Sequence, residues 1–319
     1  MTDVLILGGG GRLGRVLAAM LREAGAGRVE APGKGEVDAA DPAALAAAGA
    51  RFEAGRPDWV VCAAAWSDVA GAERNLRAAR RGNVEAPACA ARAAARWGAA
   101  FLHYSTDYVF SGGGRRVLHS GDRAEPQGAY GRTKREGERA VMREARRAGS
   151  RALVVRAGWL FSEATGEGFP ARVLEQALAG RGIRMRTNQY GRPTSYEALA
   201  RWSAAMILGD GAQRLLPGAP QVLHFAPEGP FTSRFALARR VLARAAQTAP
   251  DGARTGLLEA LRTMTGIRIH ALSQPENCRL ACEQVAFSAA SACSSWEKSV
   301  DNSVDNFLRR RFAIGGSQD

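Results

Sequence analysis

A set of glycines between an apolar run and an amphipathic stretch, near the start of the chain, most constrains what this sequence can fold into. Val4–Leu7 is uninterruptedly apolar, glycines follow at positions 8, 11 and 14, and residues 16–21 continue with apolar side chains at helical period. This spacing suits a tight strand-to-helix turn in which the backbone approaches a pyrophosphate and a helix N-terminus faces it. Because the glycines lie between a predicted strand and a predicted helix, the pattern favours a dinucleotide-binding turn over a flexible glycine loop.

The first half of the chain alternates short apolar runs with alanine-rich helical segments, as βαβ units do. Unbroken apolar strands between helices indicate a parallel sheet covered on both faces. We therefore predict an α/β fold: a Rossmann-type doubly wound parallel sheet with a smaller, interwoven C-terminal substrate lobe. The expected strands are 4–7, 28–31, 59–63, 100–105 and 152–160, and the expected helices are 12–24, 42–48, 74–97, 130–147 and 170–179.

The second half is less regular. Here the expected helices are 196–208 and 231–246, the expected strands are 221–225 and 267–271, and a polar tail over 288–319 is expected to be helical up to residue 311. No linker separates two halves, so we expect two interwoven units. The NAD(P)-binding domain would comprise residues 1–160 plus about 186–226, and the substrate-binding lobe would comprise about 161–185 and 227–319.

The net charge of +13 raises the question of a nucleic-acid partner. Only three of the 44 basic residues are lysine, which is typical of a GC-rich coding bias, and no aromatic-interleaved basic patch or helix-turn-helix pattern accompanies the charge. We therefore expect no nucleic-acid partner; an anionic small substrate explains the charge equally well.

Five cysteines in a long chain argue against a secreted disulfide framework. Cys278 and Cys282 are four residues apart, but no second pair completes a zinc set, so we expect no metal. No stretch approaches the roughly 20 apolar residues that span a bilayer, and the first residues do not resemble a signal peptide. We expect a cytoplasmic protein without membrane contact.

The choice of cofactor depends on the residues after the second predicted strand, where an acid would bind a ribose and a base would bind a 2′-phosphate. Lys34 lies twenty residues beyond Gly14, and Arg12 lies within the glycine turn, so NADPH is favoured. Glu30 argues for NADH, which remains the alternative. Asp38 is placed to reach the adenine edge.

Tyr130 and Lys134 lie four residues apart, on one face of a predicted helix. A phenol is a poor acid or base near neutral pH, and a neighbouring ammonium stabilises its phenolate and lowers its pKa. We therefore predict a catalytic pair. The alternative is an ordinary amphipathic helix with a lysine that reaches the surface.

Residues 101–110 form a strand that gives way to polar residues at its carboxyl end, which faces the ligand crevice in open α/β sheets. Thr106 would donate a hydroxyl to a substrate carbonyl beside Tyr130. The small residues Ala63, Ala64 and Ala65 close the previous strand and would let a flat nicotinamide pass. A polar strand cap is the alternative.

With these three elements in this order, the sequence resembles the extended short-chain dehydrogenase/reductases, and more narrowly the dTDP-4-dehydrorhamnose reductases. The resemblance spans nearly the whole chain. The most specific stretches are Ser-Thr-Asp-Tyr-Val-Phe at 105–110 and Gln-Tyr-Gly-Arg-Pro-Thr at 189–194; the other supporting stretches are 37–41, 63–66, 82–84, 155–161 and 275–280.

The resemblance implies NADPH-dependent reduction of the C4 ketone of a nucleotide-linked 6-deoxy-4-keto sugar, dTDP-4-dehydro-L-rhamnose being the first choice. Tyr130 would protonate the forming alkoxide, Lys134 would tune Tyr130 and bind the nicotinamide ribose, and Thr106 would hold the carbonyl oxygen. The implied substrate-binding residues are Ser67, Val69, Thr106, Asp107, Tyr108 and Trp159. The implied cofactor-binding residues are Gly8, Gly11, Arg12, Leu13, Gly14, Lys34, Asp38, Ala63, Ala64, Ala65, Tyr130 and Lys134.

The sequence departs from the family pattern in several places: Ser111 and Ala70 replace acids, and Gly168 replaces an asparagine. The usual Asn-Ser-x-Leu-Asp near the end reads Asn-Cys-Arg-Leu-Ala at 277–281. Two alternatives stay open. One is a nucleotide-sugar epimerase with the same Thr, Tyr and Lys set, and the other is a catalytically idle NADP-binding regulatory subunit. A dehydratase would need a second carboxylate after Asp107, where the chain has Tyr108. The sequence is compatible with a homodimer but does not decide the oligomeric state.

Overall fold

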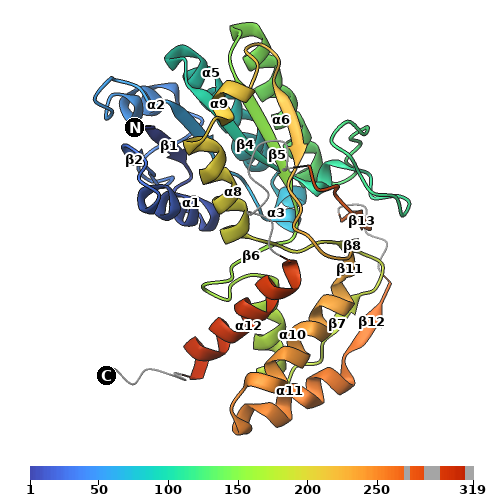
Figure 1. Cartoon of the computed structure of the whole chain (residues 1–319). Coiled ribbons are helices and arrows are strands. Elements are labelled where there is room, and N and C mark those ends of the chain that lie inside the picture. Colours follow the sequence, from blue (N-terminus) through green and yellow to red (C-terminus); the bar gives the residue numbers. More distant parts are fainter. Residues whose placement is uncertain (269–273, 284–294, 313–319) are drawn as a thin grey trace, which may run out of the picture.

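The computed structural model describes residues 1–268, 274–283 and 295–312. A six-stranded parallel sheet forms the upper part of the molecule in Figure 1. Its order is β10-β5-β4-β3-β1-β2, so the chain winds outward on both sides of β1, as in the predicted doubly wound fold. The strands are β1 (Val4–Leu7), β2 (Val29–Glu30), β3 (Trp59–Cys62), β4 (Ala100–Thr106), β5 (Ala152–Ala157) and β10 (Gln221–His224).

Helices cover both faces of this sheet, which explains why its strands are apolar on both sides. Successive side chains of a strand point to opposite faces, so Ile6 packs with one set of helices and Leu5 with the other. The Ile6 face carries α1 (Arg12–Glu23), α8 (Tyr196–Leu208) and α9 (Gly211–Arg214). The Leu5 face carries α2 (Pro42–Gly49), α5 (Ala86–Trp97) and α6 (Ala129–Ala148).

The single helix expected over 74–97 is wrong, because polar residues interrupt it. Asn75 leaves the helical conformation and its side chain accepts a hydrogen bond from the Ala78 N–H, which starts a new helix. A π-helical turn then turns Asn83 inward, where it donates to the Thr133 hydroxyl 3.0 Å away. The observed elements are α3 (Val69–Arg74), α4 (Leu76–Arg80), η1 (Arg81–Glu85) and α5.

The strand expected over 152–160 is also too long. β5 ends at Ala157, and Trp159 then has a φ of 56°, which an L residue rarely adopts and which turns the chain away from the sheet. The following strand β6 (Leu160–Phe161) pairs with β9 (Thr194–Ser195) instead. Together with β8 (Tyr190–Gly191), β11 (Thr232–Ser233) and β13 (Asn277–Cys278), these short strands lie where the sheet meets the helices below it (Figure 1).

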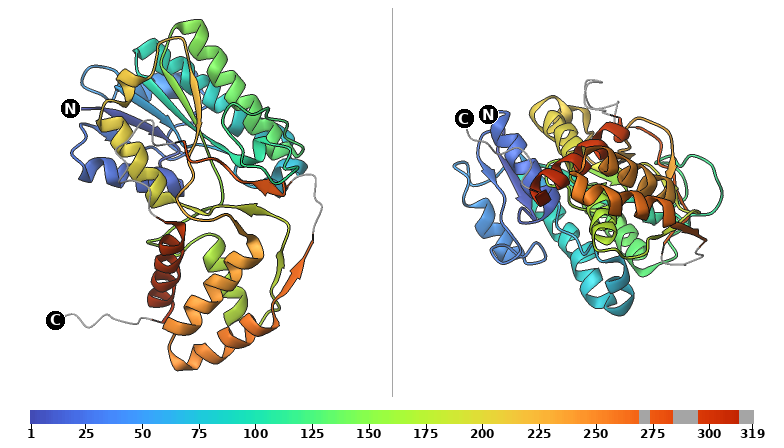
Figure 2. Two further views of the ribbon diagram at one scale, coloured as in Figure 1. Left: turned by 45° about the vertical axis from the view of Figure 1, so that its right-hand side comes forward. Right: turned by 90° about the horizontal axis from the view of Figure 1, so that it is seen from below.

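The helices below the sheet enclose a second core, separate from the two faces described above (Figure 2). It is built by α7 (Phe169–Leu178), α10 (Arg234–Thr248), α11 (Asp251–Thr263) and α12 (Trp296–Phe312), with β7 (Arg184–Arg186) and β12 (Thr265–Ile267) at its edge. The expected helix 231–246 starts later, because residues 232–233 form β11 and the Ser233 side chain caps α10. The sequence patterns missed α11 altogether.

Two expectations fall partly on undescribed residues. The strand expected over 267–271 meets the structure only at Ile267, the end of β12, and 269–273 lie outside the described residues. The helix expected in the tail is present as α12, while 288–294 and 313–319 lie outside them. Among the described residues, none of the helices is long and apolar enough to cross a membrane.

Candidate active site

The glycine turn follows β1 at the carboxyl edge of the sheet. Two of its glycines are needed because neighbouring backbone segments pack too closely to leave room for a side chain. Gly8 has a φ of +84°, and a Cβ there would lie 2.6 Å from the Ala64 backbone nitrogen. A Cβ on Gly14 would lie 2.4 Å from the Gly8 carbonyl oxygen. Gly11 begins α1 in an extended conformation and supplies no side-chain cap, so N–H groups of the first turn remain for an anion.

A cavity of about 440 Å³ opens beside this turn. It brings together many of the residues expected to bind the cofactor: Gly8, Gly11, Lys34, Asp38, Ala63, Ala64 and Ala65. Trp66 and Arg81, which the sequence reading did not assign, line it as well. Narrow apolar walls from the alanines and a cation at one end fit a dinucleotide with a flat ring and phosphates.

Three other residues expected to bind the cofactor, Arg12, Leu13 and Gly14, are not among the residues that line this cavity. The Arg12 Nε donates to Glu167 at 2.7 Å, so this guanidinium reaches across to the segment before α7. The Leu13 side chain is buried in the core, which leaves only its backbone N–H for contact with a cofactor. Gly14 packs against the turn itself.

The two residues expected to decide between NADPH and NADH, Lys34 and Glu30, lie in different surroundings. Glu30 accepts from Arg28 at 2.9 Å and ion-pairs with Arg51, and it is not among the residues that line the cavity, whereas Lys34 is. Asp38 lines the cavity and pairs with Arg81 at 2.7 Å. The Ala40 N–H and the Arg81 guanidinium lower the pKa of Asp38, so it stays a carboxylate. The Lys34 ammonium and an acid already paired with Arg81 make this end of the cavity receptive to a 2′-phosphate.

Thr106, Tyr130 and Lys134 are brought together as expected. Thr106 is the last residue of β4, and Tyr130 is the second residue of α6; the Thr106 hydroxyl lies near enough to the Tyr130 phenol to lower its pKa against the larger effect of burial. The Lys134 Nζ donates to the Tyr104 carbonyl oxygen at 2.7 Å, and its side chain is buried. The loss of hydration lowers the pKa of Lys134 to about 8.

One electrostatic expectation is wrong. We expected Lys134 to lower the pKa of Tyr130, but burial and the neighbouring Asp107 raise the pKa of Tyr130 instead. The Lys134 ammonium is directed to a backbone carbonyl rather than to the phenol. Tyr130 is therefore a neutral phenol at physiological pH, which suits a proton donor better than a base.

The residues expected around the sugar lie next to this triad. Asp107 is buried and accepts from the Thr106 hydroxyl at 2.8 Å, and burial raises its pKa. The Tyr108 ring, in the 3₁₀ turn η2 (Asp107–Val109), meets the Tyr130 ring edge-on with centroids 5.8 Å apart. Trp159, held by its left-handed backbone, carries the Arg234 guanidinium 3.7 Å from its ring centroid.

Three neighbours were missed by the sequence reading because they come from distant segments. Gln189 donates to Tyr108 Oη at 3.3 Å, accepts from the Arg234 Nε at 3.2 Å, and lies 4.0 Å from the Cys278 sulfur. The Gln-Tyr-Gly-Arg-Pro-Thr stretch was a usable signal for Gln189, whereas no local pattern marks Arg234.

Ser67 and Val69 lie around the start of α3. Their neighbour Trp66 packs with Tyr130 against a cluster of buried alanines, so the start of α3 lies beside the site.

Comparison with known proteins follows this geometry. The family model of the RmlD substrate binding domain matches residues 1–309. A dTDP-4-dehydrorhamnose reductase of Mycobacterium tuberculosis is 39% identical over 243 residues, which cover 75% of this chain and 74% of that protein. One of Streptomyces griseus is 37% identical over 234 residues, 73% of each. The structure of a Bacillus anthracis dTDP-4-dehydrorhamnose reductase in complex with NADP superposes with a TM-score of 0.75 at 20% identity, covering 94% of this chain and 97% of that one.

Proposed function

This chain belongs to the RmlD substrate binding domain family, and we propose that it reduces the C4 ketone of dTDP-4-dehydro-L-rhamnose to give dTDP-L-rhamnose, with NADPH as the reductant. The observation that carries the proposal is the placement of the Thr106 hydroxyl beside the Tyr130 phenol, with the buried Lys134 one helical turn further along α6. A hydroxyl pair of this kind can hold a carbonyl oxygen and deliver a proton to it.

The residues of the cavity fit NADPH. The backbone at Gly8 and Gly11 would take the pyrophosphate, Lys34 the 2′-phosphate, and Ala63 to Ala65 the flat nicotinamide. Asp38 would lie near the adenine. Arg12 and Leu13 would contribute mainly through their backbone N–H groups. When bound, the cofactor supplies the hydride that reaches C4.

Residues of the protein would bind and protonate the C4 carbonyl oxygen of the sugar. Thr106 donates a hydrogen bond to the carbonyl oxygen and so polarises the C4–O bond, and Tyr130 gives its proton to that oxygen as the alkoxide forms. The raised pKa of Tyr130 keeps that proton in place until the oxygen becomes basic. Lys134 ties α6 to β4 through the Tyr104 carbonyl oxygen and would bind the nicotinamide ribose.

The sugar would lie against Asp107, Tyr108 and Trp159, with Ser67 and Val69 at its border. Arg234 stacks on Trp159 and would offer a half-buried cation to the diphosphate. The proposed division is a cofactor domain of residues 1–160 plus about 186–226 and a substrate lobe of about 161–185 and 227–319. The proposal includes a cytoplasmic location and a homodimer; light scattering on the purified chain measures the second.

The test mixes purified protein with NADPH and dTDP-4-dehydro-L-rhamnose generated in situ, and follows the nicotinamide absorbance with an NADH sample alongside. We expect NADPH oxidation with formation of dTDP-L-rhamnose, and slower oxidation of NADH. An isomerised sugar without net oxidation would instead indicate an epimerase. Tight NADPH binding without turnover of any 4-keto sugar would indicate a regulatory subunit.

A further inference from the structure

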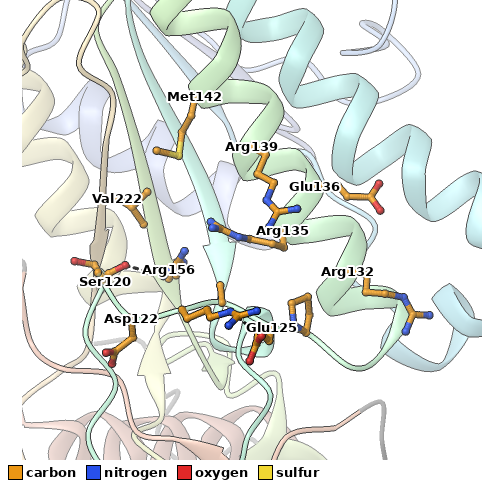
Figure 3. A pocket seen from close by; sticks show the side chains of 14 residues that line it. Ser120, Asp122, Glu125, Arg132, Arg135, Glu136, Arg139, Met142, Arg156 and Val222 are labelled. Atoms are coloured by element: carbon orange, nitrogen blue, oxygen red, sulfur yellow. Dashed lines mark hydrogen bonds and ion pairs between the residues drawn. The ribbon is translucent and has the colours of Figure 1, made fainter.

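A second cavity, of about 600 Å³, shares no lining residue with the cofactor cavity. Figure 3 shows it between the side of α6 and the strands β5 and β10, with the segment 120–126 across its lower end. The reduction described above uses none of its lining residues. Its size is in the range of small-molecule sites, about 300–1,000 Å³.

Three arginine side chains converge in this cavity. Arg135 and Arg139 lie one turn apart on α6, and Arg156 comes from β5. Figure 3 shows the guanidinium groups of Arg135 and Arg139 side by side, with that of Arg156 close to them. Like charges at this spacing repel one another, so the arrangement needs counter-charge.

Among the described residues, one carboxylate, that of Glu138, pairs with two of these three arginines. Glu138 is fully buried and accepts two hydrogen bonds from Arg156, both at 2.8 Å, and one from Arg135 at 2.7 Å. Within the described chain, Arg139 has no hydrogen-bond or ion-pair partner, and the buried Nε of Arg135 is without an acceptor. The charge of Glu138 therefore balances only one of the three positive charges of Arg135, Arg139 and Arg156.

The acidic residues that line the cavity do not neutralise these arginines. The lining carboxylates each pair with a further arginine: Asp122 with Arg116 at 2.6 Å, Glu125 with Arg123 at 2.7 Å, and Glu136 with Arg80. The Arg132 side chain, also at the rim, donates to the Gln127 carbonyl oxygen and adds positive charge. The field inside the cavity is therefore positive.

We propose that this cavity is a second ligand site, for the phosphate group of a small organic phosphate held between Arg135 and Arg139. Guanidinium forks match the oxygens of a phosphate and bind them with charge-assisted hydrogen bonds. The exposed guanidinium of Arg139, which has no partner within the described chain, supplies the free donors, and Arg135 adds its positive charge beside it. Met142 and Val222 form an apolar wall beside them, which suits the organic part of such a ligand.

The test is a phosphorus NMR titration of the full chain, saturated with NADP⁺, with inorganic pyrophosphate as the probe. Arg139→Gln is the informative variant, because this side chain is exposed and unpaired in the described structure and its replacement should leave the fold intact. Arg146→Gln, an exposed arginine of the same helix outside the cavity, is the matched control.

We expect saturable binding to wild type and to Arg146→Gln, and about tenfold weaker binding to Arg139→Gln, the effect of one charge-assisted hydrogen bond. Turnover of Arg139→Gln in the reductase assay should match wild type, which shows that the variant is folded. Equal affinity of Arg139→Gln and wild type would place the probe elsewhere and overturn the proposal. Lack of saturable binding to wild type would do the same.

Discussion

The Nζ of Lys134 donates to the backbone carbonyl oxygen of Tyr104 at 2.7 Å, which ties α6 to β4 two residues before Thr106. Tyr130 lies one helical turn before Lys134, so the contact sets the position of the phenol relative to the Thr106 hydroxyl. The lysine therefore has a structural task in addition to the proposed contact with a cofactor ribose, and its replacement should reveal both.

Tyr130→Phe should lower turnover by about 10²- to 10⁴-fold, the usual contribution of a general acid, while the Kd for NADPH stays within about twofold. The hydroxyl is proposed to act only in proton transfer, and the phenylalanine ring can still pack against Tyr108. Steady-state kinetics and a fluorescence titration with NADPH measure the two effects. Tyr190→Phe, at a half-exposed position outside the triad, is the control and should keep full activity. Full activity in Tyr130→Phe would contradict the assigned role.

Lys134→Met should lower both turnover and NADPH affinity, and it also tests the lowered pKa of Lys134. The pKa falls from 10.5 to about 8 in the folded chain, so the unfolded chain binds more protons between these values and stability rises with pH. The gain is about 3 kcal/mol when complete. Urea unfolding of wild type from pH 7 to pH 10.5 should show a rise in the free energy of unfolding that Lys134→Met lacks. Parallel curves for the two proteins would show that Lys134 has an ordinary pKa.

Lys34→Ala should weaken NADPH binding by about tenfold or more and leave NADH binding nearly unchanged, because only NADPH carries the 2′-phosphate. Glu30→Gln is the matched control, since its carboxylate is paired with Arg28 and Arg51 and is not among the residues lining the cavity. The ratio of kcat/KM values for the two cofactors measures the effect. If Glu30→Gln changes that ratio and Lys34→Ala does not, the cofactor assignment is reversed.

The parts of the site that the sequence predicted are those whose function depends on local spacing. The glycines at 8, 11 and 14 and the Tyr130–Lys134 pair need only a strand, a turn and a helix to fall into place. The doubly wound sheet was predictable for the same reason, because each βαβ unit has its own periodicity. The roles of the individual site residues remain predictions until the variants above are measured.

The remaining parts depend on contacts between distant segments. Arg81 enters the cofactor cavity because polar residues break a helix that periodicity alone would continue. Arg234 reaches Trp159 only once the lower helices have packed beneath the sheet. The raised pKa of Tyr130 follows from its burial beside Asp107. The four-residue spacing between Tyr130 and Lys134 does not reveal that environment.

Arg156→Met tests how much the buried ion pair between Arg156 and Glu138 contributes to the free energy of unfolding. Removing one partner of a buried ion pair costs about 3–5 kcal/mol, because the other charge is left without its counter-charge. The loss here should fall at the lower end, since Arg135 still donates to Glu138.

The pH dependence of the free energy of unfolding below pH 7 shows whether the stability lost in Arg156→Met is electrostatic. Arg156 is among the groups that lower the pKa of Glu138, so the pair contributes stability above the unfolded pKa of about 4.3, and that contribution is lost as the pH falls through the folded pKa. The gap between wild type and Arg156→Met in urea unfolding should therefore be full near pH 7 and narrow below about pH 4. A gap that is constant with pH would mean that Arg156 acts through packing against Phe110, 5.1 Å from its guanidinium, and not through charge. The double variant Arg156→Met/Glu138→Gln separates the two effects, because it removes the unpaired charge and should recover part of the stability only if the loss is electrostatic.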